Sequence, residues 1–120
     1  MDTRETYRQA ILTILESHRP RRQSPDGLQV TLVRDHEQGH YLMICSGWKP
    51  AGHYAFGCVL HIDLTKENQV VVRHNGTEDM IGDDLHAAGV AKEDIILAFH
   101  EPEVQAASGF DPHARGVTVH

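Results

Sequence analysis

His61 and Asp63 are the residues whose types and spacing could most readily do chemistry. They stand two positions apart in a stretch with strand character, and residues so spaced project from one face of a strand. An imidazole beside a carboxylate can bind a metal ion or act as a base held by its orienting partner. His100 could join them only if the last predicted strand lies adjacent. A metal-dependent hydrolase or nuclease using His61, Asp63 and His100 is therefore the alternative hypothesis, although a hydrogen-bonded sheet face explains such a pair better in a chain with ten histidines.

Other catalytic patterns are missing from the sequence. Ser46 and Ser108 precede glycines but lack the G-x-S-x-G form of a nucleophile elbow. Neither a G-x-x-x-x-G-K-[ST] phosphate loop nor a zinc-deaminase signature occurs. Asp83 and Asp84 are adjacent in a predicted helix, so their side chains point about 100° apart and cannot converge on one cation. We expect a protein that is not an enzyme, needs no cofactor and no metal, and uses its polar side chains for surface recognition without converging them in a reactive pocket.

Charge and length limit the partners that the chain can take. With 120 residues and a net charge of -6, the chain predicts a single domain over residues 1–120 without the basic surface that phosphate neutralisation requires. Arg19, Arg21 and Arg22 form a basic cluster, which a solvated loop explains better than a phosphate contact, so we expect direct DNA binding to be weak or absent. Residues 63–103 carry ten acidic against three basic residues, a balance that suits a basic protein partner.

The cysteines and the N-terminus indicate the compartment. Cys45 and Cys58 are too few and too far apart for a metal motif or a disulfide framework, so we expect reduced, buried thiols. The first 19 residues mix charges with a short apolar set, unlike a signal peptide. No window approaches the roughly 18 apolar residues of a membrane span. These features predict a soluble cytoplasmic protein without membrane contact.

The hydrophobic periodicity predicts a mixed order of elements. In chain order we expect a helix at 3–18, a loop at 19–27, strands at about 28–32, 40–48, 54–64 and 69–73, a helix near 80–88 and a short strand or extended segment at 94–100. Asp2 and Glu5 have capping-box spacing at the first helix. Asn75 to Thr77 offer cap chemistry for the second helix, and Gly89 suits its end.

The strand at 54–64 is the longest and the best candidate for the centre of the sheet. Its period of two places six apolar side chains on one face, namely Tyr54, Phe56, Cys58, Leu60, Ile62 and Leu64. Three tight connections in series favour an antiparallel meander, because parallel strands need long crossovers. The predicted fold class is α+β, an antiparallel four- to five-stranded meander sheet with an N-terminal helix and a second helix packed on it. The tail after about residue 103 has weak signals of order.

The ordered string of short motifs resembles one family. The motifs are YL at 41–42, GW at 47–48, GCVLHIDL at 57–64, NGTED at 75–79 and GVAKEDIILAFHEP at 89–102. Together they resemble the XisI-like family, the fdxN element excision controlling factors, from the N-terminal helix through Pro102. The resemblance implies a small α+β protein that acts with an XisH-type partner in programmed excision of a DNA element in cyanobacteria. It implies an accessory factor and no catalytic residue. After residue 102 the chain departs from the family, which commonly has a basic and aromatic stretch there.

We therefore predict an accessory protein that works through protein–protein contacts. An exposed strand edge also gives a surface through which two copies can form a homodimer. Trp48 ends a strand and is better explained as a lid on the core than as a contact residue, although tryptophan is enriched at binding centres. The candidate interaction residues are Trp48, Glu78, Asp79, Asp83, Asp84 and His100.

Overall fold

The computed structural model describes residues 2–22, 28–49, 52–77 and 79–99. Glu78, His100, Ser108 and the tail after about residue 103 lie outside these ranges, so what the sequence predicts for them stays a prediction. The same holds for the side chains of residues 20–22.

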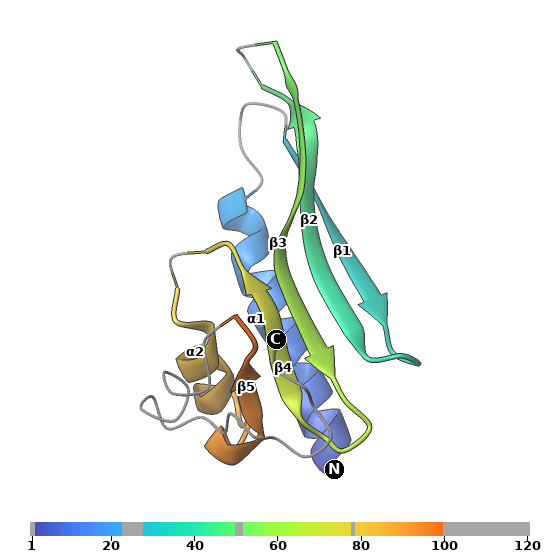
Figure 1. Cartoon of the computed structure of the whole chain (residues 1–120), viewed down its shortest axis with the longest axis vertical. Helices are drawn as coiled ribbons and strands as arrows, with labels where there is room; N and C mark the ends of the chain where they lie inside the picture. The colour runs from blue at the N-terminus through green and yellow to red at the C-terminus, as the bar shows by residue number, and fades with distance from the viewer. Residues whose placement is uncertain (1, 23–27, 50–51, 78, 100–120) are drawn as a thin grey trace.

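Within these described residues, a five-stranded sheet and two helices form the fold (Figure 1). The elements are α1 (Thr3–Arg22), β1 (Gln29–Asp35), β2 (His40–Trp48), β3 (Tyr54–Leu64), β4 (Val70–Asn75), α2 (Ile81–Ala87), the 3-10 turn η1 (Lys92–Asp94) and β5 (Ile95–Leu97). The strands lie in the order β1-β2-β3-β4-β5. The first four pair antiparallel, and β5 joins β4 in parallel. The predicted α+β meander is confirmed, with β3 at its centre.

The helix α1 covers one face of the sheet through its apolar stripe. Tyr7, Ile11 and Leu15 are buried at helical spacing and pack with the inward side chains of the sheet. The Asp2 carboxylate accepts a hydrogen bond from the Glu5 amide at 2.7 Å, which is the predicted N-terminal cap. The predicted end at residue 18 is wrong, because α1 continues to Arg22. Proline normally disfavours a helix beyond its first turn because it lacks an amide donor, yet the helical backbone here runs through Pro20.

A β-bulge in β3 changes which side chains reach the core. Met43 pairs with Leu60, whereas the next residue of β2, Ile44, pairs with Cys58, so Val59 is the extra residue. Leu60, like Ile62 and Leu64, faces the helices and is buried. The prediction of one continuous apolar face on β3 is wrong for Tyr54, Phe56 and Cys58. The bulge turns these three side chains to the opposite face, which we call the open face.

The helix α2 starts later than the cap residues predict. Asn75 Oδ1 accepts hydrogen bonds from the backbone and hydroxyl of Thr77, so this pair closes a turn before the helix instead of capping it. The helix begins at Ile81, and Met80, the first residue of the predicted helix, is 71% exposed. Gly89 has φ +116° just past the helix, as predicted for a C′ glycine.

The segment from Gly89 to Leu97 fastens β5 and η1 to the first helix. The Tyr7 hydroxyl donates to Asp94 Oδ2 at 2.5 Å and accepts from the Ala91 amide at 3.3 Å. Val90 and Ile95 are buried in the same cluster as α1. Burial raises the pKa of Tyr7, and the hydrogen bond to Asp94 adds to the increase. These contacts give the segment a structural role, because they hold η1 and β5 against α1.

Candidate functional site

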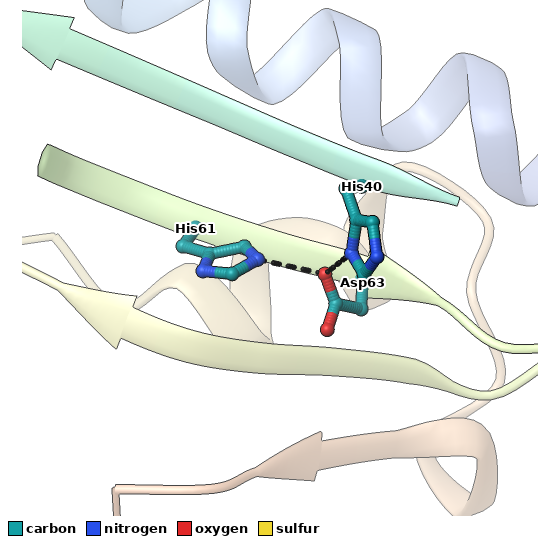
Figure 2. A group of neighbouring side chains, drawn as sticks. All are labelled: His40, His61 and Asp63. Carbon is teal, nitrogen blue, oxygen red and sulfur yellow. Dashed lines mark hydrogen bonds and ion pairs between the residues drawn. The ribbon is translucent and has the colours of Figure 1, made fainter. Parts of the chain in front are cut away.

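His40, His61 and Asp63 come together on the open face of the sheet (Figure 2). His40 begins β2, and its antiparallel partner in β3 is Asp63. Asp63 Oδ1 lies 2.7 Å from His40 Nδ1 and 2.8 Å from His61 Nε2. Figure 2 shows both imidazoles directed at that oxygen. The spacing of His61 and Asp63 therefore has the predicted effect of placing them on one face.

Asp63 is the centre of this cluster. Its second oxygen, Oδ2, accepts a hydrogen bond from Arg73 Nε at 2.8 Å, so three donors surround a carboxylate that is only 7% exposed. Burial on its own would raise the pKa of Asp63, but the hydrogen bonds from His40 and Arg73 and the charges of the two histidines outweigh it and lower the pKa. Asp63 is consequently a paired carboxylate in the ionised state.

Sequence reasoning missed His40 and Arg73. His40, His61 and Asp63 converge because antiparallel pairing joins residues 23 positions apart, whereas the expectation concerned convergence in a reactive pocket and stays a prediction. The strand pairing itself was the signal that could have found His40, had the register been known. The predicted third member, His100, lies outside the described residues.

Three aromatic side chains gather at the far end of the β2–β3 hairpin, and we call them the aromatic tip. Trp48, Tyr54 and Phe56 are 65%, 54% and 72% exposed. Trp48 and Tyr54 are paired across the strands with ring centroids 5.4 Å apart. The interpretation of Trp48 as a core lid is wrong, because β2 and β3 extend past the end of α1 (Figure 1) and neither helix of the described part of the chain lies over this face. The aromatic tip is an exposed apolar patch of the kind that marks interaction sites.

The predicted acidic residues are divided between solvent and the fold. Asp83 is exposed on the first turn of α2. Asp79 and Asp84 instead lie close to His18, a buried residue of α1, and His18 Nε2 is 3.5 Å from Asp79 Oδ2. A ligand atom of each of these three residues falls within 4.8 Å of the others. Of the three acids described, Asp83 is therefore the one most available to a partner.

The exposure of one cysteine differs from the prediction, and Arg19 is the arginine of the basic cluster whose side chain the structure describes. Cys45 is partly buried and Cys58 is exposed, so the prediction of two buried thiols is wrong for Cys58, which the bulge turns outward. Arg19 lies 3.8 Å from Glu16 one turn earlier, which partly neutralises its charge. Among the described residues, no helix has both the length and the apolar character required to cross a bilayer.

Known proteins are similar to this chain in sequence and in structure. The family model described as XisI protein matches residues 1–111. A XisI-like protein from Anabaena variabilis has a similar crystal structure, with a TM-score of 0.79, 24% identity, and coverage of 90% of this chain and 97% of that chain. The crystal structure of the fdxN element excision controlling factor XisI from Anabaena variabilis has a TM-score of 0.76 and 26% identity, covering 92% of this chain and 98% of that chain. None of the curated proteins matches the sequence.

Proposed function

Because the chain belongs to the XisI family, we propose that it is an accessory protein in the control of DNA element excision, acting through contact with a protein partner and not through catalysis. Its similarity over nearly the full length to an fdxN element excision controlling factor supports the process. An XisH-type protein is the partner that the family resemblance implies.

The observation that carries the proposal is the aromatic tip. Trp48, Tyr54 and Phe56 contribute exposed apolar surface at the end of the longest hairpin, where they add nothing to the core. Leaving such side chains in water forgoes roughly 25 cal/mol for each Å² that burial would remove. Tryptophan and tyrosine also supply a large share of the energy at protein interfaces. We therefore assign the aromatic tip as the main contact surface.

The acidic start of α2 is a second contact surface in this proposal. Asp83 is exposed there and supplies the charge, whereas the exposed Met80 beside it is not assigned to the contact. A basic patch on the partner would be drawn to this charge, which affects the rate of association more than the final affinity. Asp79 and Asp84 contribute less to such a contact, because they lie against His18 within the fold.

Asp63 is poorly suited to the hydrolase alternative. A general base has to reach a water or substrate proton, and Asp63 is buried with both oxygens engaged by His40, His61 and Arg73. The observed arrangement supports a stabilised polar cluster better than a carboxylate ready to accept a proton.

The experiment is a binding titration with the XisH-type protein encoded in the same genome. Trp48→Ala and Phe56→Ser are expected to weaken binding by about 30-fold each, the effect of losing an interface hot spot of about 2 kcal/mol. Met80→Ser removes an equally exposed apolar side chain elsewhere and is expected to leave the affinity unchanged. Asp83→Lys is expected to slow association, most clearly at low salt.

Two results would count against the proposed surface. Unchanged affinity in both aromatic variants would remove the aromatic tip from the interface, and a loss confined to Met80→Ser and Asp83→Lys would move the contact to α2. The other predicted contact is a homodimer in which a second copy is joined through the edge strand β1. Light scattering on the chain alone tests for it.

A further inference from the structure

We infer that His40, His61 and Asp63 form a binding site for one divalent transition-metal ion, and that Zn²⁺ is the ion it fits best. His40, His61 and Asp63 each offer one ligand atom, and these atoms all lie within 4.8 Å of one another. Two imidazoles and one carboxylate are a donor set that zinc takes up in proteins, with a further position left for water. Cation binding goes beyond the proposed function and does not depend on it.

Asp63 Oδ1 stands slightly closer to each histidine nitrogen than a bound zinc requires. Asp63 Oδ1 is 2.7 Å from His40 Nδ1 and 2.8 Å from His61 Nε2. Around a tetrahedral zinc, ligand atoms lie about 3.3 Å apart, because each bond to the metal is about 2.0 Å long. The imidazoles therefore have to swing outward by about half an ångström. Both have room to do so, since the side chains of His40 and His61 are 49% and 29% exposed.

The proton positions also permit bonds to zinc to replace the hydrogen bonds between the histidines and Asp63. In the hydrogen-bonded cluster the ring nitrogen that faces Asp63 carries a hydrogen, whereas a metal ligand must present a lone pair. A ring with a single N–H can move that proton to its other nitrogen without any net loss of a proton. Within the described part of the chain, His40 Nε2 and His61 Nδ1 have no other hydrogen-bond partner, so the exchange breaks no further bond.

Arg73 tunes the affinity of the site. It holds Asp63 Oδ2 at 2.8 Å, which leaves Oδ1 directed at the two histidines. Its positive charge also repels a cation bound at Oδ1. A neutral glutamine at this position can still donate a hydrogen bond to Asp63 and lacks the repulsion, so the structure gives a substitution that should tighten binding.

The other group of three ligand atoms is a weaker candidate. His18, Asp79 and Asp84 offer a single imidazole, and His18 is 2% exposed. Zinc favours nitrogen ligands over carboxylates at such sites and needs a path from solvent. This group therefore supplies the matched control for the first.

The test is calorimetric titration of Zn²⁺ into the metal-free full chain at neutral pH. We expect one strong equivalent, weakened at least about tenfold by His40→Ala or His61→Ala. Arg73→Gln should tighten binding about tenfold, the Coulomb repulsion of a divalent and a univalent cation roughly 6 Å apart in water. Asp84→Asn controls for the second group and His53→Ala for an exposed surface histidine. Both controls should bind like the unaltered chain.

A second measurement uses the unaltered chain, because removing a histidine also removes a hydrogen bond to Asp63. Nitrogen-15 spectra of the imidazoles are expected to show Zn²⁺ shifting His40 Nδ1 and His61 Nε2 first. Absence of a strong equivalent would overturn the inference. So would shifts confined to other histidines, or full affinity retained in both histidine variants.

Discussion

Replacing Tyr7 by phenylalanine tests whether contacts with α1 hold the segment from Gly89 to Leu97 in place. The Tyr7 ring is 5% exposed and stays buried in the variant, so only the hydroxyl contacts are lost. One is the short bond to the Asp94 carboxylate and the other is the long bond from the Ala91 amide. A bond to a charged group is worth about 1.5–3 kcal/mol and a neutral one about 1 kcal/mol.

Because Asp94 and Ala91 keep partial access to water, we expect a total loss near the lower end, about 2 kcal/mol. For a chain of this length, that corresponds to a decrease in Tm of about 8 °C. Urea unfolding followed by circular dichroism measures the free energy directly. Tyr54→Phe is the control, because Tyr54 is 54% exposed and its change should stay within about 0.5 kcal/mol. Equal effects in the two variants would refute the docking role of Tyr7.

The same substitution has a signature at high pH. The pKa of Tyr7 is raised in the folded state, chiefly by burial and then by Asp94, so the folded chain holds this proton more tightly than the unfolded chain. Its contribution is complete below about pH 10 and decreases as the pH rises toward the folded-state pKa. The stability difference between the original chain and Tyr7→Phe should therefore shrink above pH 10. A difference that grows there would contradict the assigned hydrogen bonds.

Two further predictions follow from the sheet. Gly39→Ala should cost more than about 3 kcal/mol, because Gly39 has φ +78° and an added Cβ would lie 2.1 Å from the Leu64 carbonyl oxygen. The control is Gly52, which has φ +90° but open space around an added Cβ, so Gly52→Ala should cost about 1–2 kcal/mol. Both losses are measured by the same urea assay, and equal losses would exclude the steric explanation. Cys58 should react with a thiol reagent faster than Cys45 because it is the more exposed of the two, yet more slowly than free cysteine because the partial burial of its thiol raises the pKa. Saturating XisH-type partner should slow the reaction at Cys58, and an unchanged rate would place the interface away from this part of the open face.

Local signals were sufficient for most of the fold. The stripe on α1, the alternation in β1 and the glycine after α2 each depend on neighbours a few residues apart, and each element formed where it was expected. Element ends were less predictable. Asn75 and Thr77 have cap chemistry, but they satisfy each other in a turn, and the choice between turn and cap depends on where β4 leaves the sheet.

The residues of the candidate sites come together only in the observed register of β2 and β3. The alternation of apolar and polar residues along a strand does not reveal that register. Counting back from the Trp48–Tyr54 pair in unbroken register would place His40 opposite Ile62, a core position. The bulge at Val59 advances the pairing by one residue and brings His40 opposite Asp63 instead.

The same bulge also explains why the sequence pattern did not reveal the aromatic tip. Leu60 and Ile62 keep their inward direction beside α1, whereas Phe56, four residues before Leu60 and therefore of the same parity, is reversed to the open face. A strand that is read as one apolar face is thus two half-strands with opposite faces, one for the core and one left in solvent. Deleting Val59 would remove the bulge and leave both half-strands in their observed register, so Phe56 would stay on the open face and His40 would stay opposite Asp63. One inserted residue therefore hides from the sequence pattern both the surface assigned to the protein partner and the cluster assigned to the cation, which is why neither could be assembled from that pattern alone.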